Sequence, residues 1–293
     1  MFRKPDWNTE GADWPHRSSS RFVQAAGLRW HVQHMGQGPV LVLLHGTGAA
    51  THSWHKIMPL LAAHHTVFAM DLPGHGFTQT PPGLLGYRDL SLSGMAGLVQ
   101  GLLKQELATA PTAFIGHSAG AALGAEMILS GTIKAQQLIS INGAFAGFEG
   151  LAAHVFPTLA KLIALNPVTI LALAASAKDQ ARVEKLLAGT GSKLDAFSLD
   201  LYGRLFRAPG HVGAVMAMMA NWQLDKLAPR LPLLTAKTSL IAGLGDLTVS
   251  PSVSHDAAHT IPHARLIEVA GLGHLAHEEA PEQICDIILT ELR

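Results

Sequence analysis

Short runs of aliphatic and β-branched residues alternate along the chain with longer stretches that carry apolar residues at helical spacing. The first run, 21–35, has a turn signal near Gly27 and predicts a hairpin. Six later runs are apolar without alternation, as strands buried on both faces usually are: 40–44, 66–70, 113–115, 138–141, 239–242 and 265–269. Helices are predicted between them, at 54–63, 91–107, 119–129 and 281–292. This alternation predicts an α/β fold with a mostly parallel sheet and helices on its faces.

The alternation is interrupted once, between residues 143 and 237, where helix signals occur without a convincing strand. Asn166 followed by Pro167 is typical of a helix start, because Asn caps the first turn and Pro fits its first position. Gly189 is typical of a helix end, and Ser192 predicts the cap of the following helix. We therefore expect residues 143–237 to form a helical lid inserted into the α/β core.

The rest of the chain divides around this insertion. Residues 21–142 and 238–293 carry the strand signals and are expected to form one core. Residues 1–20 form a polar leader that contains two tryptophans, and burial stabilises such large aromatic side chains. We expect this leader to be a strap that docks on the core.

Composition narrows the possible function classes. Lys plus Arg and Asp plus Glu both total 21, so the formal net charge is zero and nothing favours a nucleic-acid partner. Charged residues are only 14% of the chain and 48% are hydrophobic, which excludes disorder. Two lid segments with almost no charge, 150–177 and 208–224, are candidates for the roof of an apolar pocket. The single cysteine, Cys285, excludes an internal disulfide, and we expect a cytoplasmic protein without a signal peptide or a spanning helix.

A candidate nucleophile lies in Gly-His-Ser-Ala-Gly, residues 116–120. This pentapeptide follows a predicted strand and precedes a predicted helix, which is the context of a nucleophile elbow. Glycines are needed there because the sharp turn brings strand and helix close together. Ser118 is therefore expected at the carboxyl edge of the sheet, with an inert serine in a glycine-rich turn as the alternative.

A serine nucleophile needs a base, and the base needs a group that orients it. In this order along the chain, Asp246 follows one predicted strand and His274 follows the next. Both are therefore expected at the same sheet edge as Ser118. His277 is a competing base, three residues further on. The other acid position, after residue 141, holds Asn142 instead of a carboxylate.

Acyl transfer also needs donors for a developing oxyanion. The sequence His-Gly-Thr-Gly at 45–48 leaves a predicted strand where such a loop belongs. We assign the backbone N–H groups of Thr47 and Ala119 to the oxyanion hole. The Thr47 side chain is either a further donor or a simple turn residue.

Five motifs together resemble the α/β-hydrolase fold over nearly the whole chain: residues 45–48, 71–76, 116–120, the Asp246 turn and the Gly273-His274 loop. More narrowly, residues 6–15, 40–52 and 71–78 resemble the BchO family of magnesium-chelatase accessory proteins in bacteriochlorophyll synthesis. This resemblance implies a role in the tetrapyrrole pathway near magnesium insertion, with a porphyrin as ligand and magnesium-chelatase subunits as partners. It does not supply a defined reaction.

The 17 histidines raise the question of a metal site. His255, His259 and His263 are spaced four apart, as ligands on one helix face would be. Pro262 interrupts that helix before the third histidine, and no cysteine or carboxylate cluster completes the set. We therefore expect a surface helix, with no metal and no cofactor.

Four residues are candidate substrate contacts. His52 and Trp54 follow the predicted oxyanion loop and border the pocket mouth, while Met216 and Met219 lie in the uncharged part of the lid. Methionine side chains adapt to a large flat ligand. The competing interpretations are a solvated helix start for His52 and core packing for the other three.

Two functions follow. The first is a serine hydrolase acting on an ester or acyl bond of an apolar substrate, with Ser118 as nucleophile, His274 as base and Asp246 as its orienting group. The second is a non-catalytic carrier that binds a porphyrin and presents it to magnesium chelatase. A third, weaker hypothesis is peripheral membrane contact through residues 162–177 of the lid.

Overall fold

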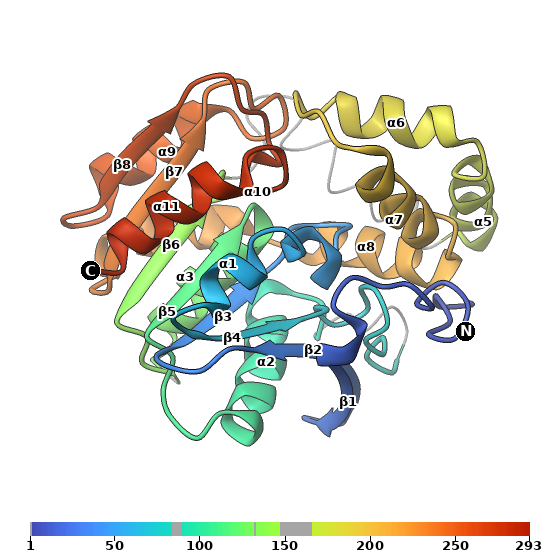
Figure 1. Cartoon of the computed structure of the whole chain (residues 1–293), viewed down its shortest axis with the longest axis horizontal. Coiled ribbons are helices and arrows are strands. Elements are labelled where there is room, and N and C mark those ends of the chain that lie inside the picture. Colours follow the sequence, from blue (N-terminus) through green and yellow to red (C-terminus); the bar gives the residue numbers. More distant parts are fainter. Residues whose placement is uncertain (1, 84–88, 132, 147–165) are drawn as a thin grey trace.

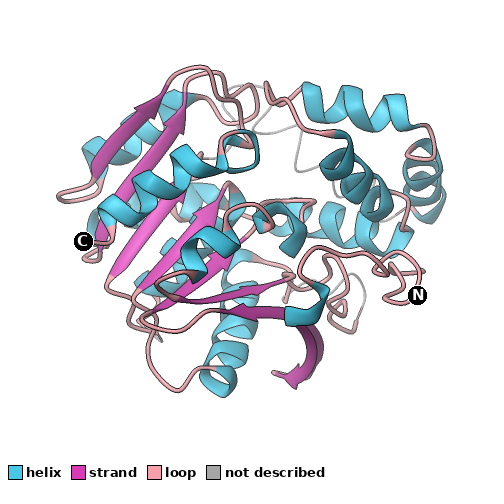
Figure 2. Cartoon of the chain, in the orientation of Figure 1, coloured by secondary structure: helices cyan, strands magenta, loops and turns pink. Residues whose placement is uncertain are grey.

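An eight-stranded sheet runs through the computed structural model, which describes residues 2–83, 89–131, 133–146 and 166–293 (Figures 1 and 2). The strands lie in the order β1-β2-β4-β3-β5-β6-β7-β8. Their bounds are β1 Ser20–Ala25, β2 Leu28–Met35, β3 Val40–Leu44, β4 Thr66–Met70, β5 Ala113–His117, β6 Gln137–Ile141, β7 Lys237–Gly243 and β8 Arg265–Val269. The predicted hairpin and the six later strands are confirmed. The expected burial is wrong for 265–269, because β8 lies at the edge of the sheet and only its Val269 is buried.

The hairpin at the sheet edge is antiparallel and the rest of the sheet is mostly parallel. β1 pairs with β2, and β2 with β4, in antiparallel register, whereas all pairs from β4 to β8 are parallel. Ala26 and Gly27 connect β1 to β2 with φ values of 48° and 76°. Two successive residues with positive φ are typical of a type I′ turn, whose twist matches that of the strands it joins.

Helices cover both faces of the sheet, and alternate strand residues supply the core on each side. Val42 and Leu44 pack with α2, α3 and α9, while Leu41 and Leu43 pack with α1 and α11. The bounds are α1 Met58–Ala62, α2 Leu92–Glu106, α3 Ala119–Leu129, α9 Pro251–Thr260 and α11 Pro281–Glu291. Cys285 on α11 belongs to the second of these cores and is buried. The central strands of the sheet are buried on both faces, which explains their apolar sequences: β4, β3, β5, β6 and β7.

The helix predicted at 54–63 is shorter in the structure. Residues 51–54 form a 3-10 turn, η2 Thr51–Trp54, and the α-helix starts only at Met58. Pro59 lies in the first turn of α1, where its missing N–H costs no hydrogen bond. The proline therefore fixes the start of the helix, and the preceding residues form turns instead.

Among the residues that the structure describes between β6 and β7, four α-helices gather at the end of the molecule that also holds the N-terminus (Figure 1). Their bounds are α5 Pro167–Ser176, α6 Gln180–Ala188, α7 Ala196–Phe206 and α8 Pro209–Asn221, and the 3-10 turns η4 Leu224–Lys226 and η5 Ala228–Leu233 follow. The Asn166 side chain caps α5 as expected, accepting from the N–H groups of Val168 and Thr169. The segments expected at 150–177 and 162–177 lie partly outside the described residues.

The prediction that Ser192 caps the next helix is wrong. Asp195 is the N-cap of α7, and its carboxylate accepts a 2.7 Å hydrogen bond from the N–H of Ser198. The Ser192 hydroxyl instead accepts from the N–H of Leu275, at 2.8 Å. Both residue types are good caps, so propensity alone does not choose between them.

The leader packs against the body through aromatic side chains. Trp14 is 2% exposed and donates from Nε1 to the Thr51 hydroxyl at 3.0 Å. Trp7 packs edge-on against Phe22 and Phe77. The Arg204 guanidinium on α7 donates to the Asp13 carboxylate. Within the part of the chain that the structure describes, no helix has the length and apolar character needed to cross a membrane.

Candidate active site

Ser118 lies at the sharp turn between β5 and α3. Its φ of 52° and ψ of −118° fall outside the regions that most residues adopt, a conformation that typically costs about 1–3 kcal/mol. A Cβ atom on Gly120 would lie 1.9 Å from the Leu44 carbonyl oxygen, and one on Gly116 would lie 2.5 Å from the Ala121 nitrogen. The two glycines of the pentapeptide are therefore required sterically, as the sequence predicts, and hold Ser118 at the carboxyl end of β5.

Asp246 and His274 lie in contact at the same sheet edge. Oδ2 of Asp246 is 2.7 Å from Nδ1 of His274, and both residues are more than nine-tenths buried. The other carboxylate oxygen accepts from the N–H groups of Thr248 and Val249, at 2.7 and 2.9 Å. These bonds fix the carboxylate plane, so the imidazole is held at Nδ1 and its Nε2 is left for another partner.

The segment between α6 and α7 forms hydrogen bonds with both loops that carry Asp246 and His274. The carbonyl oxygen of Thr190, which follows α6, accepts from the N–H groups of both Leu247 and His274, each at 3.2 Å. A Cβ on Gly273 would lie 2.4 Å from the carbonyl carbon of Gly191, so these two loops are in backbone contact. The position of His274 thus depends on the segment between α6 and α7.

His277 does not contact Asp246. It is the second residue of the short helix α10 Ala276–Glu279 and is fully buried. Its ring packs on the rings of Trp54 and His117, with centroid distances of 4.6 and 4.5 Å. Burial lowers the pKa of His277 to about 3, so its ring is neutral. Between the two histidines left open by the sequence, the geometry favours His274 as the partner of Asp246.

The expected oxyanion loop approaches the nucleophile elbow. A Cβ on Gly46 would lie 3.1 Å from the Cβ of Ser118, so the loop after β3 is directly beside the serine. Thr47, the next residue, is exposed. Ala119 is the first residue of α3, where backbone N–H groups have no acceptor within the helix. The structure therefore places the loop that carries Thr47 and the start of α3 on either side of Ser118.

Residues 39–281 match the family model for the alpha/beta hydrolase fold. The chain belongs to the α/β-hydrolase family. Over 282 residues it is 37% identical to the magnesium-chelatase 30 kDa subunit of Rhodobacter capsulatus, a match covering 95% of this chain and 96% of that relative. It is also 36% identical over 110 residues to a pimeloyl-acyl-carrier-protein methyl ester esterase of Aeromonas hydrophila, which covers 38% and 40% of the two chains.

Solved structures give the same fold. An α/β-hydrolase fold protein from Burkholderia ambifaria superposes with a TM-score of 0.77 at 24% identity, over 92% of this chain and 97% of that one. Both resemblances found in the sequence, to the α/β hydrolases and to magnesium-chelatase accessory proteins, are confirmed by these matches.

The four predicted substrate contacts lie on two elements, His52 and Trp54 on η2 and Met216 and Met219 on α8. His52 is fully buried rather than solvated, and its ring packs between Trp14 and Tyr202, with centroid distances of 5.3 and 4.4 Å. Trp54 is fully buried against His277. Met216 is half-buried and packs with α5 and α8, and Met219 is half-buried on α8. The leader covers His52 through Trp14, a contact 38 positions apart along the chain that no local pattern reveals.

Sequence reasoning missed a buried acid beside His274. Glu278 on α10 is 1% exposed and accepts a 2.8 Å hydrogen bond from the Tyr202 hydroxyl on α7. Burial raises the pKa of Glu278 to about 8 and, together with the nearby Glu278, holds the pKa of Tyr202 well above its usual value. The sequence indicated only that Glu278 follows His274 by four residues, and nothing local indicated that its side chain is buried.

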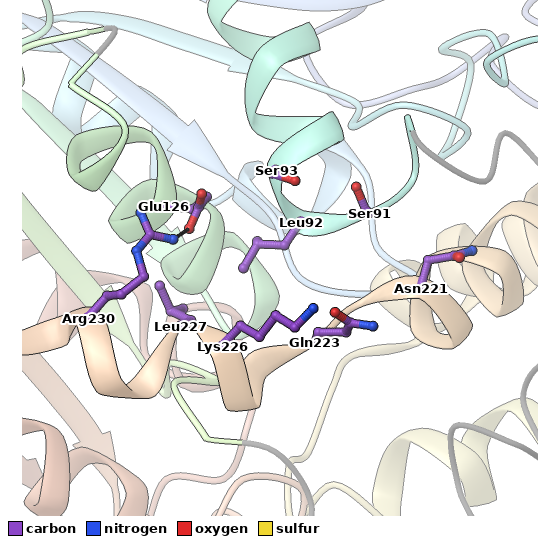
Figure 3. Close-up of a pocket in the computed structure, with 9 residues that line it drawn as sticks. All are labelled: Ser91, Leu92, Ser93, Glu126, Asn221, Gln223, Lys226, Leu227 and Arg230. Atoms are coloured by element: carbon purple, nitrogen blue, oxygen red, sulfur yellow. Dashed lines mark hydrogen bonds and ion pairs between the residues drawn. The ribbon is translucent and has the colours of Figure 1, made fainter.

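A separate hollow of about 200 Å³ lies away from these residues, between the start of α2, α3 and the turns η4 and η5 (Figure 3). At one end Arg230 forms a 2.6 Å ion pair with Glu126. Lys226 and Gln223 extend along the wall that faces Leu92 and Ser91. None of the predicted site residues lines it. This hollow is therefore distinct from the Ser118 site.

The histidines considered as metal ligands lie on and beyond α9. His255 is 2.9 Å from Oε1 of Glu268, and His263 lies past the end of the helix with a φ of 57°. In residues 2–83, 89–131, 133–146 and 166–293, no group of three or more His, Cys, Asp or Glu side chains is arranged to hold a metal ion.

Proposed function

We propose that this α/β hydrolase is a serine hydrolase that uses Ser118, His274 and Asp246. The observation that carries the proposal is the 2.7 Å contact between Asp246 and His274 at the same sheet edge as the Ser118 elbow. His274 would take the hydroxyl proton as Ser118 attacks an ester or acyl carbonyl, and Asp246 would orient and stabilise the resulting imidazolium. His274 then returns the proton to the leaving group, and water releases the acyl group by the same steps.

The oxyanion of the tetrahedral intermediate needs donors that are already in place. The N–H groups of Ala119 and Thr47 are the proposed pair, one at the start of α3 and the other on the loop beside Ser118. The positive end of the α3 dipole adds to this stabilisation. Removing one such donor typically costs about 10²–10³ in rate.

The substrate is proposed to be apolar. Phe206 on α7 lies over the oxyanion loop, because a Cβ on Gly48 would be 3.5 Å from its ring. Within the predicted lid at 143–237, the described helices α5 to α8 are proposed to form a cap over this edge of the core, while residues 147–165 lie outside the described residues. On the outer face of α5, Val168 and Leu171 are 72% and 49% exposed, which leaves apolar surface available to a partner.

The likeness to the magnesium-chelatase 30 kDa subunit supports a place in tetrapyrrole synthesis. We therefore assign the hydrolase to the step at which magnesium chelatase acts, in association with chelatase subunits. A porphyrin or its ester is the substrate class that combines this setting with an apolar cap.

A fluorophosphonate probe tests the serine hydrolase directly. Intact-mass analysis should show one adduct on the folded protein, and peptide mapping should locate it at Ser118. The Ser118→Ala variant should remain unlabelled, while Ser93→Ala, which removes an exposed serine at the start of α2, should label like the wild type. A folded wild-type chain that takes up no adduct would overturn the proposal.

The tetrapyrrole assignment has its own test. Titration with protoporphyrin IX, followed by tryptophan fluorescence, should show saturable binding to Ser118→Ala as well as to the wild type. Absence of saturable binding at micromolar concentrations would overturn the porphyrin assignment and leave the hydrolase to other apolar esters. Binding without any fluorophosphonate adduct would favour the carrier function instead.

A further inference from the structure

Asn142 holds a strained position at the centre of the sheet edge. It follows β6, which lies between β5, the strand that leads to Ser118, and β7, the strand that leads to Asp246. The residue is 3% exposed. Its φ is 49°, in the left-handed region, where Asn is tolerated better than most side chains. Its backbone N–H donates to the Ile241 carbonyl at 2.9 Å, which extends the β6 to β7 pairing by one residue.

The Asn142 side chain joins two loops of the candidate active site. Nδ2 donates to the carbonyl oxygens of Gly273 and His274, both at 2.9 Å. Oδ1 accepts from the N–H of Gly243 at 2.7 Å. Gly243 in turn accepts a backbone hydrogen bond from Asp246. One side chain therefore contacts the backbone of the acid turn and the backbone of the histidine loop.

A second residue contributes to the same arrangement. Nε2 of His117 lies 2.8 Å from the His274 carbonyl oxygen and is the donor, since a carbonyl can only accept. The His274 carbonyl thus accepts from both His117 and Asn142, while the His274 N–H is held by Thr190. The backbone of His274 is fixed on both sides, while its ring contacts the Asp246 carboxylate through Nδ1 and packs on the His117 ring, with a centroid distance of 4.7 Å.

We propose that Asn142 is a positioning residue that sets the orientation of His274 relative to Asp246. This inference rests on the proposed serine hydrolase, because the orientation matters only if His274 acts on Ser118. The chemistry selects an amide at this position, since it supplies two donors for carbonyl oxygens and one acceptor for an N–H. A carboxylate would place a negative oxygen against the Gly273 and His274 carbonyls.

Two variants separate the side chain from the backbone strain. Asn142→Gly removes all three side-chain bonds while its backbone accepts a φ of 49° at no steric cost. Asn142→Asp keeps the shape and the acceptor for Gly243 but removes the donors to Gly273 and His274. Asn221→Gly is the matched control, because it removes an amide that bonds only to the Ala217 carbonyl on α8.

The first measurement is the rate of phosphonylation of Ser118 as a function of pH. Misplacing a catalytic group by about 1 Å can cost about 100-fold in rate, so we expect Asn142→Gly and Asn142→Asp to react about 10- to 100-fold more slowly than wild type. The midpoint of the pH profile should also move in both variants. The Asn221→Gly control should keep the wild-type rate and midpoint.

The second measurement does not require activity. In protein labelled with ¹⁵N-histidine, the Nδ1–H resonance of His274 is assigned by its loss in His274→Gln. We expect it to shift or broaden in Asn142→Gly and Asn142→Asp but not in Asn221→Gly. An unmoved resonance in the folded variants would overturn the positioning role, even if the probe reacted more slowly.

The two proposals can fail separately. If the wild type takes up no probe but the resonance moves in the Asn142 variants, the serine hydrolase is wrong, while the control of His274 orientation by Asn142 stands. If the probe labels Ser118 at equal rates in wild type and Asn142→Gly, the hydrolase stands and the positioning role is overturned. Should Asn142→Gly fail to fold, Asn142→Asp gives the same decision.

Discussion

The Tyr202 hydroxyl on α7 donates a 2.8 Å hydrogen bond to Oε1 of Glu278 on α10, four residues after His274. Burial raises the pKa of Glu278 to about 8, so the acid is protonated at neutral pH. The neighbouring His277 is neutral as well, because burial lowers its pKa to about 3. The hydrogen bond between Tyr202 and Glu278 therefore joins two neutral side chains at neutral pH.

The free energy of unfolding should fall as the pH rises from about 4.5 to about 8, because Glu278 keeps its proton in the folded chain. An unfolded glutamate titrates near 4.5, so between about pH 4.5 and about pH 8 only the folded chain keeps the proton on Glu278. The free energy of unfolding then decreases by up to about 1.4 kcal/mol per pH unit. Glu278→Gln lacks this dependence, so its stability relative to the wild type should increase from about pH 5 to about pH 8.

Urea denaturation at several pH values measures this difference. Tyr202→Phe is the matched variant, because the Tyr202 hydrogen bond lowers the pKa of Glu278 and its loss should extend the pH dependence to higher pH. Parallel stability curves for wild type and Glu278→Gln would contradict the prediction.

Asp246→Asn should abolish most activity without unfolding the protein. The Asn oxygen can still accept from Thr248 and Val249, but its amide nitrogen would face the Nδ1–H of His274, donor against donor. The imidazole then loses the tautomer that the reaction needs, a change that typically costs about 10⁴ in rate. Stopped-flow phosphonylation and thermal melting check the two halves of the prediction. A wild-type rate in the folded variant would exclude Asp246 from the site.

Trp14→Ala should destabilise the whole molecule rather than only the leader. Trp14 is fully enclosed against Thr51, His52 and Phe77, and truncation of such a side chain typically costs about 3–5 kcal/mol. Trp14→Phe should lose mainly the hydrogen bond to Thr51, about 1 kcal/mol. Chemical denaturation with both variants gives the comparison. Equal losses would mean that the hydrogen bond, not packing, fixes the leader.

Asp71→Asn should be costly at neutral pH. The Asp71 carboxylate is fully buried and accepts from Nδ1 of His31 and from the N–H groups of Thr51 and Phe77. Burial alone would raise the pKa of Asp71, but His31 and these hydrogen bonds hold it well below its usual range. The stabilisation that the Asp71 carboxylate provides is therefore present above about pH 4, and it is lost as the pH falls towards the lower pKa of Asp71 in the folded chain.

The expected loss for Asp71→Asn is about 3–5 kcal/mol at pH 7, the usual cost of breaking a buried pair. The variant should also lose less further stability than the wild type in acid. Unfolding curves at about pH 7 and about pH 3 test both statements. A variant as stable as the wild type at neutral pH would contradict them.

The strands were predictable because burial on both faces leaves a local pattern. Residues 40–44 and 66–70 coincide with β3 and β4, since parallel strands under helices need continuous apolar sequence. The elbow at Ser118 was predictable for a similar reason, because its glycines meet backbone from a neighbouring strand and from the turn itself. Motifs with a steric cause are visible in the sequence.

Contacts between distant segments were not predictable. Nothing near His52 indicates that Trp14 and Tyr202 will enclose its ring, and nothing near Glu278 indicates a tyrosine 76 residues away. Asn142 was visible only as a missing carboxylate, because its three side-chain partners lie at the end of β7 and on the loop that follows β8. Burial of polar groups depends on tertiary neighbours, and a single sequence does not contain them.

The burial of Cys285 makes the protein convenient for site-specific labelling. The side chain is 2% exposed, and burial raises the pKa of its thiol to about 11, so almost none of the reactive thiolate forms at neutral pH. Because the chain has one cysteine, a thiol introduced at an exposed position such as Val168 would be the single reactive one. A fluorophore on α5 could then report distances to the body of the protein without any change to the native core.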